Sequence, residues 1–406
     1  MINMGLNHES VKLRNRQNIL RLISDSGAMS RKDIAQKMHL TSAAVTQICN
    51  ELIENGEIIE CGTIENSGRA GRKKILVDIN GNHKYICSIV IEKYYSFVTI
   101  TDLKAKVIDS VQINTNNLIE PTIFIEKLKD IALSLFEKYN LSKDNMLGIG
   151  VSVVGVVDKQ NGVSLHAYGI WDEPVPIKEI LNKYIDVDII VENNVSSFAQ
   201  AEIIYGMGKC YDSLLFVRWH PGIGGAFIID GRLHKDHEGK TTELGHIITG
   251  VSKKKCKCGK IGCLETMVSS SSILEQIKEV YSEQRTPRLY ELTNGDIDNV
   301  NDVMEELYLK EDMFLDEEIR NIIDRAIRQV AKTIVNTVAL MTPDKVVLWG
   351  KFFRNKYILQ YFYKSCAKLE GDYDAIKMIK SDLDKKSTYI GGVAIAYNDL
   401  FISVKN

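Results

Sequence analysis

One segment of 23 residues carries the clearest signal in the chain. It reads ELGHIITGVSKKKCKCGKIGCLE and runs from Glu243 to Glu265. One histidine with three cysteines is a usual ligand set of a closed, tetrahedral zinc site. Gly259 and Gly262 allow the backbone to fold back, so that the last cysteine can reach the same metal. We therefore predict a Zn²⁺ site whose ligands are His246, Cys256, Cys258 and Cys263.

Two carboxylates, Glu243 and Glu265, bracket these ligands. A purely structural metal site does not need them, so they indicate a polar ligand beside the metal. Two alternatives are weaker. The cysteines are too densely clustered with a histidine to suggest three unrelated free thiols in a loop. A disulfide is disfavoured because Cys256 and Cys258 are spaced too tightly and nothing else indicates secretion.

The segment resembles the signature of the ROK family, which comprises repressors, open reading frames and sugar kinases. The family pattern is Glu-x-Gly-His, a short loop, then Cys-x-Cys-Gly-x-x-Gly-Cys-Leu-Glu. This resemblance implies that the histidine and cysteines hold zinc, and that both glutamates and the histidine face the hydroxyls of a sugar. The matching residues are Glu243, Gly245, His246, Cys256, Cys258, Gly259, Gly262, Cys263, Leu264 and Glu265.

Length and composition are those of an ordinary globular protein. The 406 residues are enough for two or three domains, with 45% hydrophobic and 26% charged residues and a net charge of -2. Residues 1–80 carry eleven Lys and Arg against nine Asp and Glu, about +2, and the remainder is about -4. No apolar run reaches the roughly 18 residues of a membrane span, and no secretion signal is visible. We expect a cytoplasmic protein with no membrane segment.

The first 80 residues show the pattern of a winged helix-turn-helix. Helices are predicted over 11–26, over 31–38 after the capping residue Ser30, and from Ser42 to about Gly56. Two short helices joined by a tight turn are typical of helix-turn-helix domains. Residues 57–61 and 74–79 read as strands, and between them lies a basic, glycine-rich tip. This hairpin is the predicted wing.

The predicted third helix and the wing suit DNA. Small and polar side chains on a recognition helix can approach base edges in the major groove: Ser42, Ala43, Ala44, Thr46 and Gln47. Arg69 and Arg72 suit a narrow minor groove, and Lys73 suits phosphates. The alternative is a helical protein-interaction domain with a solvated basic loop. ROK repressors carry such a module and ROK kinases lack it, so the resemblance also favours DNA binding.

The rest of the chain alternates strands and helices. Three strands are predicted over 84–91, 96–101 and 107–113, then a helix over 121–139 and a buried strand over 147–155. The resemblance implies the two-lobed, actin-like ATPase fold of sugar kinases. We expect residues 1–80 to form the winged helix-turn-helix and 81–195 a first α/β lobe completed by a helix in 388–406. Residues 196–387 should form a second lobe with the zinc site and sugar pocket.

The catalytic features of ROK kinases are missing. Their phosphate-binding turn, Asp-x-Gly-Gly-Thr, is matched here by residues 90–95, which contain no glycine. Their Glu-Asn-Asp motif, whose Asp is the general base, is matched by Glu192, Asn193 and Asn194. An amide can hydrogen-bond a hydroxyl but cannot take its proton. We therefore expect Asn193 and Asn194 to bind a sugar without phosphorylating it, although the pair could also simply cap the following helix.

Two further nucleotide-binding loops of the kinases have also changed. The segment 219–226 replaces a Gly-Thr-Gly-x-Gly-Gly-Gly loop and reads as a hairpin, and Gly350 alone remains of a glycine pair. By the same resemblance, Gly155 and the loop 168–171 are expected to lie over the ligand. Trp171 could equally belong to the core.

Together these features predict a sugar-responsive transcriptional regulator, most simply a repressor that a monosaccharide releases from a palindromic operator. We expect a homodimer or tetramer, because palindromic operators require paired reading helices. The sugar-contacting residues predicted are Gly155, Asn193, Asn194, Glu243, His246 and Glu265. Two alternatives remain: an ATP-dependent sugar kinase with a DNA-binding extension, and a DNA-binding protein whose only ligand is zinc.

Overall fold

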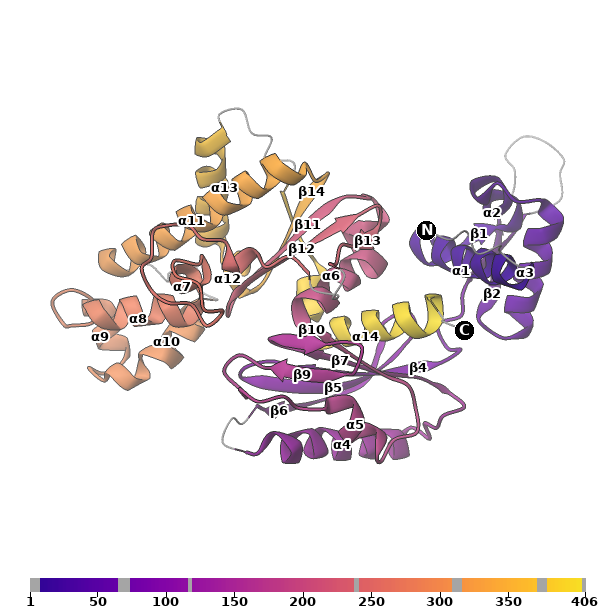
Figure 1. The fold of residues 1–406 in the computed structure, drawn as a ribbon, viewed down its shortest axis with the longest axis horizontal. Coiled ribbons are helices and arrows are strands. Elements are labelled where there is room, and N and C mark those ends of the chain that lie inside the picture. Colours follow the sequence, from indigo (N-terminus) through magenta and orange to yellow (C-terminus); the bar gives the residue numbers. More distant parts are fainter. Residues whose placement is uncertain are drawn as a thin grey trace. The chain divides into compact units, whose positions relative to one another are not determined.

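A computed structural model describes residues 8–64, 74–115, 119–236, 241–308, 316–370 and 378–403. The chain forms two compact units, which are coloured by sequence in Figure 1. Unit 1 comprises Met1–Lys209 with Lys385–Asn406, and unit 2 comprises Cys210–Asp384. We predicted a boundary after residue 195, whereas residues 196–209 group with unit 1, because the helix that begins at Asn194 packs on the first sheet.

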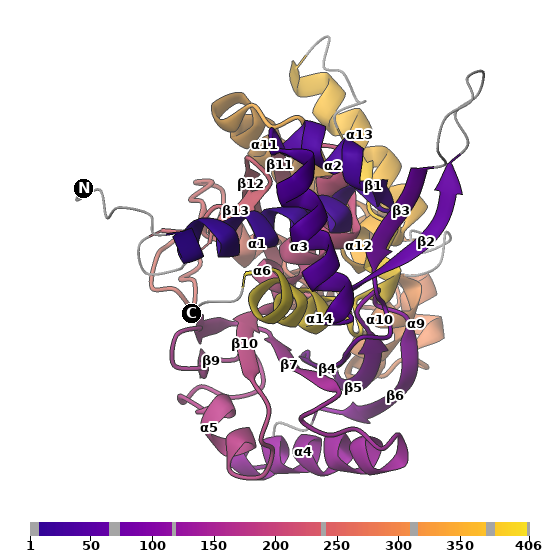
Figure 2. The same cartoon turned by 90° about the vertical axis from the view of Figure 1, so that its right-hand side faces the viewer.

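Unit 1 begins with a small domain of three helices and a three-stranded sheet in the order β1-β3-β2. Ser30 caps α2 by accepting a hydrogen bond from the Asp33 N–H, and Thr41 caps α3 in the same way through the Ala44 N–H. The hairpin of β2 and β3 extends from one side of the three helices (Figure 2). Its elements are α1 (His8–Ser26), β1 (Met29–Ser30), α2 (Arg31–Met38), α3 (Ser42–Glu54), β2 (Ile58–Ile64) and β3 (Lys74–Ile79).

The larger part of unit 1 is a five-stranded sheet in the order β10-β7-β4-β5-β6. Helices α4 and α5 cover one face, and α6 and α14 cover the other (Figure 2). A hairpin of β8 and β9 follows β7. The bounds are β4 (Tyr85–Ile91), β5 (Tyr95–Asp102), β6 (Val107–Asn114), α4 (Pro121–Lys138), β7 (Met146–Val153), β8 (Val156–Asp158), β9 (Val163–His166), α5 (Ile177–Asn182), β10 (Ile189–Asn193), α6 (Asn194–Tyr205) and α14 (Ile390–Ala396).

The C-terminal helix packs unusually closely on this sheet. A Cβ atom at Gly150 of β7 would lie 1.9 Å from the carbonyl oxygen of Gly392 in α14. The Ser88 hydroxyl of β4 donates to the carbonyl of Tyr389 just before that helix, at 2.7 Å. Residues Tyr397–Ile402 continue α14 as a π-helix, a form that often marks functional sites. The last part of the described chain is therefore held against strands that are encoded some 240 to 300 residues earlier.

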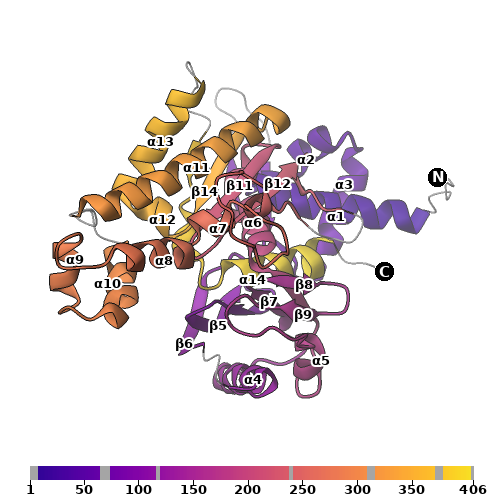
Figure 3. The same cartoon turned by 60° about the vertical axis from the view of Figure 1, so that its left-hand side comes forward.

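Unit 2 is built on a second five-stranded sheet, in the order β13-β12-β11-β14-β15. Helices α11 and α13 lie side by side and pack with α8 and α10 around an apolar core (Figure 3). The bounds are β11 (Leu214–Trp219), β12 (Ile223–Ile229), β13 (Arg232–Leu233), α7 (Glu265–Val268), α8 (Ser270–Val280), α9 (Pro287–Leu292), α10 (Val300–Leu307), α11 (Glu317–Met341), β14 (Lys345–Trp349), α12 (Lys351–Arg354), α13 (Lys356–Glu370) and β15 (Met378–Lys380).

Candidate metal centre and ligand site

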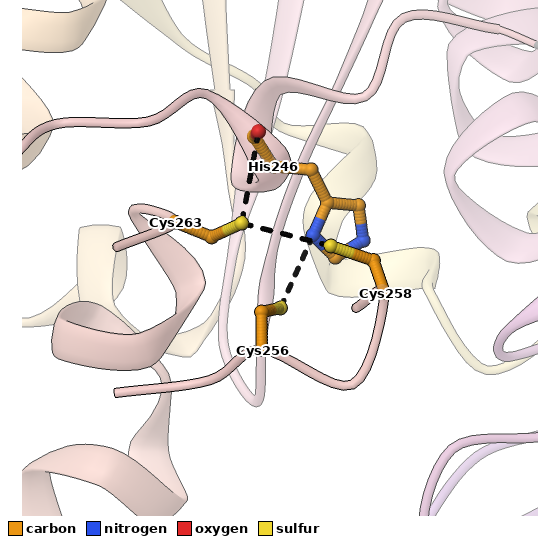
Figure 4. Close-up of side chains that lie close together, drawn as sticks. All are labelled: His246, Cys256, Cys258 and Cys263. Atoms are coloured by element: carbon orange, nitrogen blue, oxygen red, sulfur yellow. Dashed lines mark hydrogen bonds between the residues drawn. The ribbon is translucent and has the colours of Figure 1, made fainter. Parts of the chain in front are cut away.

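The structure brings all four predicted metal ligands together in unit 2 (Figure 4). Their donor atoms lie within 4.8 Å of one another. The Sγ of Cys256 is 3.5 Å from Nδ1 of His246, and the Sγ atoms of Cys258 and Cys263 are 3.6 Å apart. Within the described parts of the chain, this is the one group of His, Cys, Asp and Glu side chains with such geometry.

These separations fit a tetrahedral metal. Bonds of about 2.3 Å to sulfur and 2.0 Å to nitrogen put tetrahedral ligand atoms about 3.5 to 3.8 Å apart. The two printed separations, 3.5 Å and 3.6 Å, agree with that requirement. The set of one nitrogen and three sulfur donors suits a borderline-soft ion, and a closed set of four leaves no open position for catalysis. The cluster can hold a metal.

Local backbone geometry explains why distant sequence positions meet here. His246 ends a short 3₁₀ turn, Leu244–His246, and the next segment pairs with the cysteine loop through a bridge between Ile248 and Cys263. Gly259 and Gly262 adopt φ values of +90° and +81°, which L side chains rarely adopt. The predicted use of both glycines as turn residues is confirmed.

Glu265 lies at the start of α7, where backbone surrounds its carboxylate. The N–H of Ile223 donates to its Oε2 at 2.9 Å. A Cβ atom at Gly222 would lie 2.6 Å from Oε1, and a Cβ atom at Gly245 would lie 3.1 Å from Oε2. Burial raises the pKa of Glu265 to about 7, and the Ile223 N–H opposes this shift. The two glycines thus make room for this carboxylate two residues from a metal ligand.

Glu243 is exposed, and its Oε2 lies 3.8 Å from Nε2 of His246. Because Nδ1 of that ring faces the sulfur atoms, Nε2 is directed away from the metal position. A carboxylate beside the outer nitrogen of a metal-bound histidine fixes its tautomer and ring orientation. The gap is too long for a direct hydrogen bond, which leaves room for a hydroxyl near both groups.

The remaining predicted ligand residues lie in unit 1. Asn193 caps α6: its Oδ1 accepts from the N–H groups of Val195 at 2.8 Å and Ser196 at 3.2 Å. Its Nδ2 donates to the carbonyl of Gly155, whose φ of +102° and close approach to His166 exclude a side chain. Asn193 therefore has the capping role that we considered from sequence. Its contact with a sugar stays a prediction.

Asn194 is 2% exposed and its Nδ2 donates to Oε1 of Glu92 at 3.0 Å. Glu92 follows β4 in the turn that the sequence comparison aligns with a phosphate-binding turn. Nothing in the local sequence pairs these two residues, which are 102 positions apart. Trp171, which we left between ligand loop and core, is 6% exposed, packs in the unit 1 core and donates to Ser164 at 3.1 Å.

The predicted DNA-contacting residues of α3 lie on the face away from its buried side. Four of them are exposed and Ala44 is half-buried, whereas Val45, Ile48, Cys49 and Leu52 form the packed face. The predicted wing residues Arg69, Arg72 and Lys73 lie outside the described residues. The exposed residues are Ser42, Ala43, Thr46 and Gln47.

A sequence profile of the ROK family matches residues 93–399. The chain belongs to the ROK family. A profile of the MarR family matches residues 14–59, which include α2 and α3. The ROK match covers the two sheets and the metal cluster, and the MarR match covers the helices of the small N-terminal domain.

Similar proteins cover almost the whole chain. It is 27% identical over 393 residues to the DNA-binding transcriptional dual regulator NagC of Escherichia coli strain K12, which covers 96% of this chain and 93% of NagC. It is 24% identical over 402 residues to the xylose repressor of Caldicellulosiruptor bescii, which covers 97% of this chain and 98% of that protein.

Solved structures share the fold. A ROK family transcriptional regulator, described as a homologue of the E. coli MLC protein, superposes with a TM-score of 0.75 at 23% identity over 97% of each chain. A ROK family glucokinase from Streptomyces griseus, in complex with glucose and AMPPNP, gives a TM-score of 0.63 at 18% identity over 78% of this chain and 100% of that chain. The predicted winged helix-turn-helix followed by a sugar-kinase-like α/β body is confirmed.

In unit 2, side chains occupy positions that ROK kinases keep as glycine loops. His220 follows β11, and its Nε2 lies 3.1 Å from Oε1 of Glu305 in α10. Lys351, directly after Gly350, donates to the other carboxylate oxygen of Glu305 at 2.7 Å. These three residues form a partly buried charged cluster that no sequence motif announced. Its charges are already paired within the protein, so a nucleotide phosphate placed there would face Glu305.

The Glu305 cluster gives a pH-dependent stability prediction. Burial alone raises the pKa of Glu305, but His220 and Lys351 outweigh it and lower the pKa to about 2. The carboxylate therefore contributes stability above about pH 4.5, and this contribution is lost as the pH falls toward 2. Glu305→Gln should lower the free energy of unfolding by about 2 kcal/mol at pH 7. Urea denaturation of wild type and variant at several pH values checks this.

The matched control is Glu291→Gln, which breaks an exposed pair with Arg288 and should change stability little at any pH. The difference between wild type and Glu305→Gln should shrink as the pH is lowered from 5 to 3. A difference that stays constant over that range would contradict the assignment of a low pKa to this carboxylate.

Among the helices of the described residues, none combines the length and the apolar character that a membrane crossing requires.

Proposed function

We propose that this protein is a sugar-responsive, DNA-binding transcriptional repressor of carbohydrate-utilisation genes. The observation that carries the proposal is the span of its resemblance to named regulators. NagC and the xylose repressor each match at least 96% of the chain, including both the helix-turn-helix and the ROK body. ROK kinases, by contrast, match only the body; the glucokinase covers 78% of the chain.

The proposed effector is a monosaccharide. Glu243, His246 and Glu265 in unit 2, and Asn193, Asn194 and Gly155 in unit 1, are the residues that we propose contact its hydroxyls or shape its site. Carboxylates and amides suit this task because they accept and donate hydrogen bonds in fixed directions. Asn194 cannot serve as a general base, so a bound sugar would not be phosphorylated.

Zinc is the metal that we propose for the His246, Cys256, Cys258 and Cys263 cluster. Its preference for four tetrahedral nitrogen and sulfur ligands fits the donor set. When bound, it would fix the His246 ring and the loop that leads to Glu265, so the metal orders sugar-contacting groups and takes no part in a reaction. We also propose that the protein acts in the cytoplasm, where thiolate ligands stay reduced.

We propose that the operator is a palindrome read by a homodimer or tetramer, with α3 in the major groove and the wing residues Arg69, Arg72 and Lys73 on the minor groove and backbone. Sugar binding would change the spacing of two reading helices and lower DNA affinity. The size of the response equals the difference in sugar affinity between the DNA-bound and DNA-free states.

The proposal is tested by three measurements on the full-length protein. Selection of bound fragments from genomic DNA identifies the operator, and fluorescence anisotropy then measures its affinity with and without glucose, xylose and N-acetylglucosamine. A coupled ATPase assay with the same sugars tests the kinase alternative. Thermal-shift measurements test whether any of these sugars binds. Sugar-stimulated ATP turnover, or the absence of any operator, would refute the proposal.

Two substitutions test the division of labour. Gln47→Ala removes an exposed recognition-helix amide, and Arg72→Ala removes a wing guanidinium. Each should weaken operator binding by about tenfold, corresponding to the 1–3 kcal/mol of one good base contact, and leave sugar affinity unchanged. Anisotropy and calorimetry measure the two affinities. Asn50→Ala is the matched control for Gln47, because it lies on the same helix but outside the predicted contact set. Equal loss of both affinities would argue against separate modules.

A further inference from the structure

We infer that the effector site accepts a neutral, unphosphorylated sugar and disfavours the phosphate ester of the same sugar, and that Glu92 is the residue that sets this preference. The inference rests on the proposed sugar site. It identifies the chemical class of the ligand, which neither the motif nor the similar proteins specify for this chain.

The first observation is the hydrogen bond from Asn194 to Glu92. A carboxylate accepts hydrogen bonds, so the amide must turn its Nδ2 toward Glu92, at 3.0 Å. Asn194 is 2% exposed, which leaves the side chain little freedom to rotate. Its Oδ1 is then the atom left to meet a ligand, and an amide oxygen accepts a hydrogen bond from a hydroxyl. A phosphate ester has no such proton to give at neutral pH.

The second observation concerns the start of α6, where a helix could otherwise bind an anion. The free N–H groups of a helix N-terminus favour phosphates. Here Asn193 Oδ1 already accepts from the N–H groups of Val195 and Ser196. The neighbouring turn, residues 92–95, contains no glycine that would expose a cradle of backbone N–H groups. Both usual sources of phosphate-binding donors are therefore occupied or missing at this place.

The third observation is the local charge. Glu192 is 5% exposed and accepts from the N–H of Asn193 at 3.0 Å, so a second carboxylate lies directly behind the asparagine pair. Lys159 is shared between Glu192 and Asp399, at 3.3 Å and 2.8 Å, so its positive charge is already matched by two negative ones. The groups around Asn193 and Asn194 thus favour a neutral ligand.

Lys93 is the cation that could oppose this preference. Its stem runs along Gly169, whose Cβ position is 3.4 Å from the Lys93 Cε, and its ammonium lies 5.1 Å from the ring centre of Tyr94. It is therefore directed along the 168–169 loop, whereas Glu92 contacts the predicted ligand residue directly. A phosphate ester carries about -1.5 to -2 charges at pH 7, and one carboxylate within several ångströms disfavours it by about tenfold or more.

Calorimetric titration of the full-length protein tests the inference. The probes are two matched pairs, glucose with glucose 6-phosphate and N-acetylglucosamine with N-acetylglucosamine 6-phosphate. For the pair whose free sugar binds, that sugar should bind about tenfold tighter than its ester, or better. Glu92→Gln should reduce this ratio several-fold, because it removes the charge and keeps the shape. Glu179→Gln, an exposed carboxylate on α5 of the same unit, is the control and should leave the ratio unchanged.

The outcomes separate this inference from the proposed function. If neither sugars nor esters bind the wild-type protein, the proposed sugar site itself fails. If an ester binds as tightly as its sugar, or tighter, the sugar site stands and this inference is overturned. An ester affinity that disappears in Lys93→Gln would identify Lys93 as a phosphate ligand and would also overturn it. The wild-type ratio decides the matter even if Glu92→Gln does not fold.

Discussion

Cys258→Ser is expected to release the bound metal, lower the melting temperature and weaken sugar binding. Cys258 is exposed at the rim of the cluster, 3.6 Å from Cys263 Sγ, so serine fits without a clash but is a poor zinc ligand. Structural zinc sites contribute about 10–16 kcal/mol of binding free energy, which stabilises the folded loop. Without the metal, His246 and the turn before Glu265 lose their common anchor, and sugar affinity should fall by about tenfold or more.

Metal content, melting temperature and sugar affinity are measured by elemental analysis, thermal denaturation and calorimetry. Cys210→Ser is the matched control, because Cys210 is also exposed but lies outside the cluster. It should change none of the three quantities. A Cys258→Ser protein that keeps one metal per chain would show that three ligands suffice, and wild-type protein that carries no metal would contradict the zinc proposal itself. Operator affinity without sugar should survive, because α1 to α3 belong to the other unit.

The features that could be predicted from sequence are those with short-range physical causes. The caps Ser30 and Thr41 bond donors only three residues away, so α2 and α3 could be placed from the sequence. The four metal ligands span only 18 residues, and glycines with positive φ mark the turns between them. The replacement of a general base by Asn194 was visible because a motif aligned around it.

The features that sequence reasoning missed depend on contacts between distant segments. Glu92 meets Asn194 across 102 residues, and Glu305 meets His220 across 85. Neither carboxylate lies in a periodic pattern or a motif, and each looks like an ordinary surface charge until the fold brings its partner. The second roles of Gly222 and Gly245, which make room for Glu265, were hidden for the same reason. A glycine in a loop has many possible causes, and only the structure shows which atom lies where its Cβ would be.

A charged contact in unit 1 connects the asparagine motif to the DNA-binding domain. Lys159, in the turn between β8 and β9, lies 2.8 Å from Asp399 in the π-helix and 3.3 Å from Glu192 in β10. Two positions from Asp399, the Tyr397 hydroxyl donates to Ser24 Oγ of α1 at 3.2 Å. The residues beside the proposed sugar contacts and the first helix of the DNA-binding domain therefore touch the same π-helix, which could transmit a change at one to the other.

Lys159→Met is expected to uncouple sugar from DNA. Methionine keeps the length of the side chain but leaves Glu192 and Asp399 without their shared cation, which should cost about 1–2 kcal/mol of stability, since Lys159 is partly exposed. Allosteric coupling typically changes affinity by about 5- to 150-fold, and in the variant the effect of sugar on operator affinity should fall toward onefold. Anisotropy titrations with and without sugar measure this ratio. Lys183→Met, which breaks an exposed pair with Glu179, is the control and should keep the wild-type ratio.

Sugar affinity and operator affinity must each be measured alone, because their separate losses mean different things. If Lys159→Met still binds sugar and operator but no longer responds, the contact transmits the signal. If the response is intact, the π-helix does not carry it through Asp399, and Tyr397→Phe then tests the hydroxyl contact to Ser24 on its own. Where both residues act along one route, the double variant should lose no more response than the stronger single variant, because coupled residues are not additive. An additive loss would mean that two independent paths leave the sugar-binding lobe.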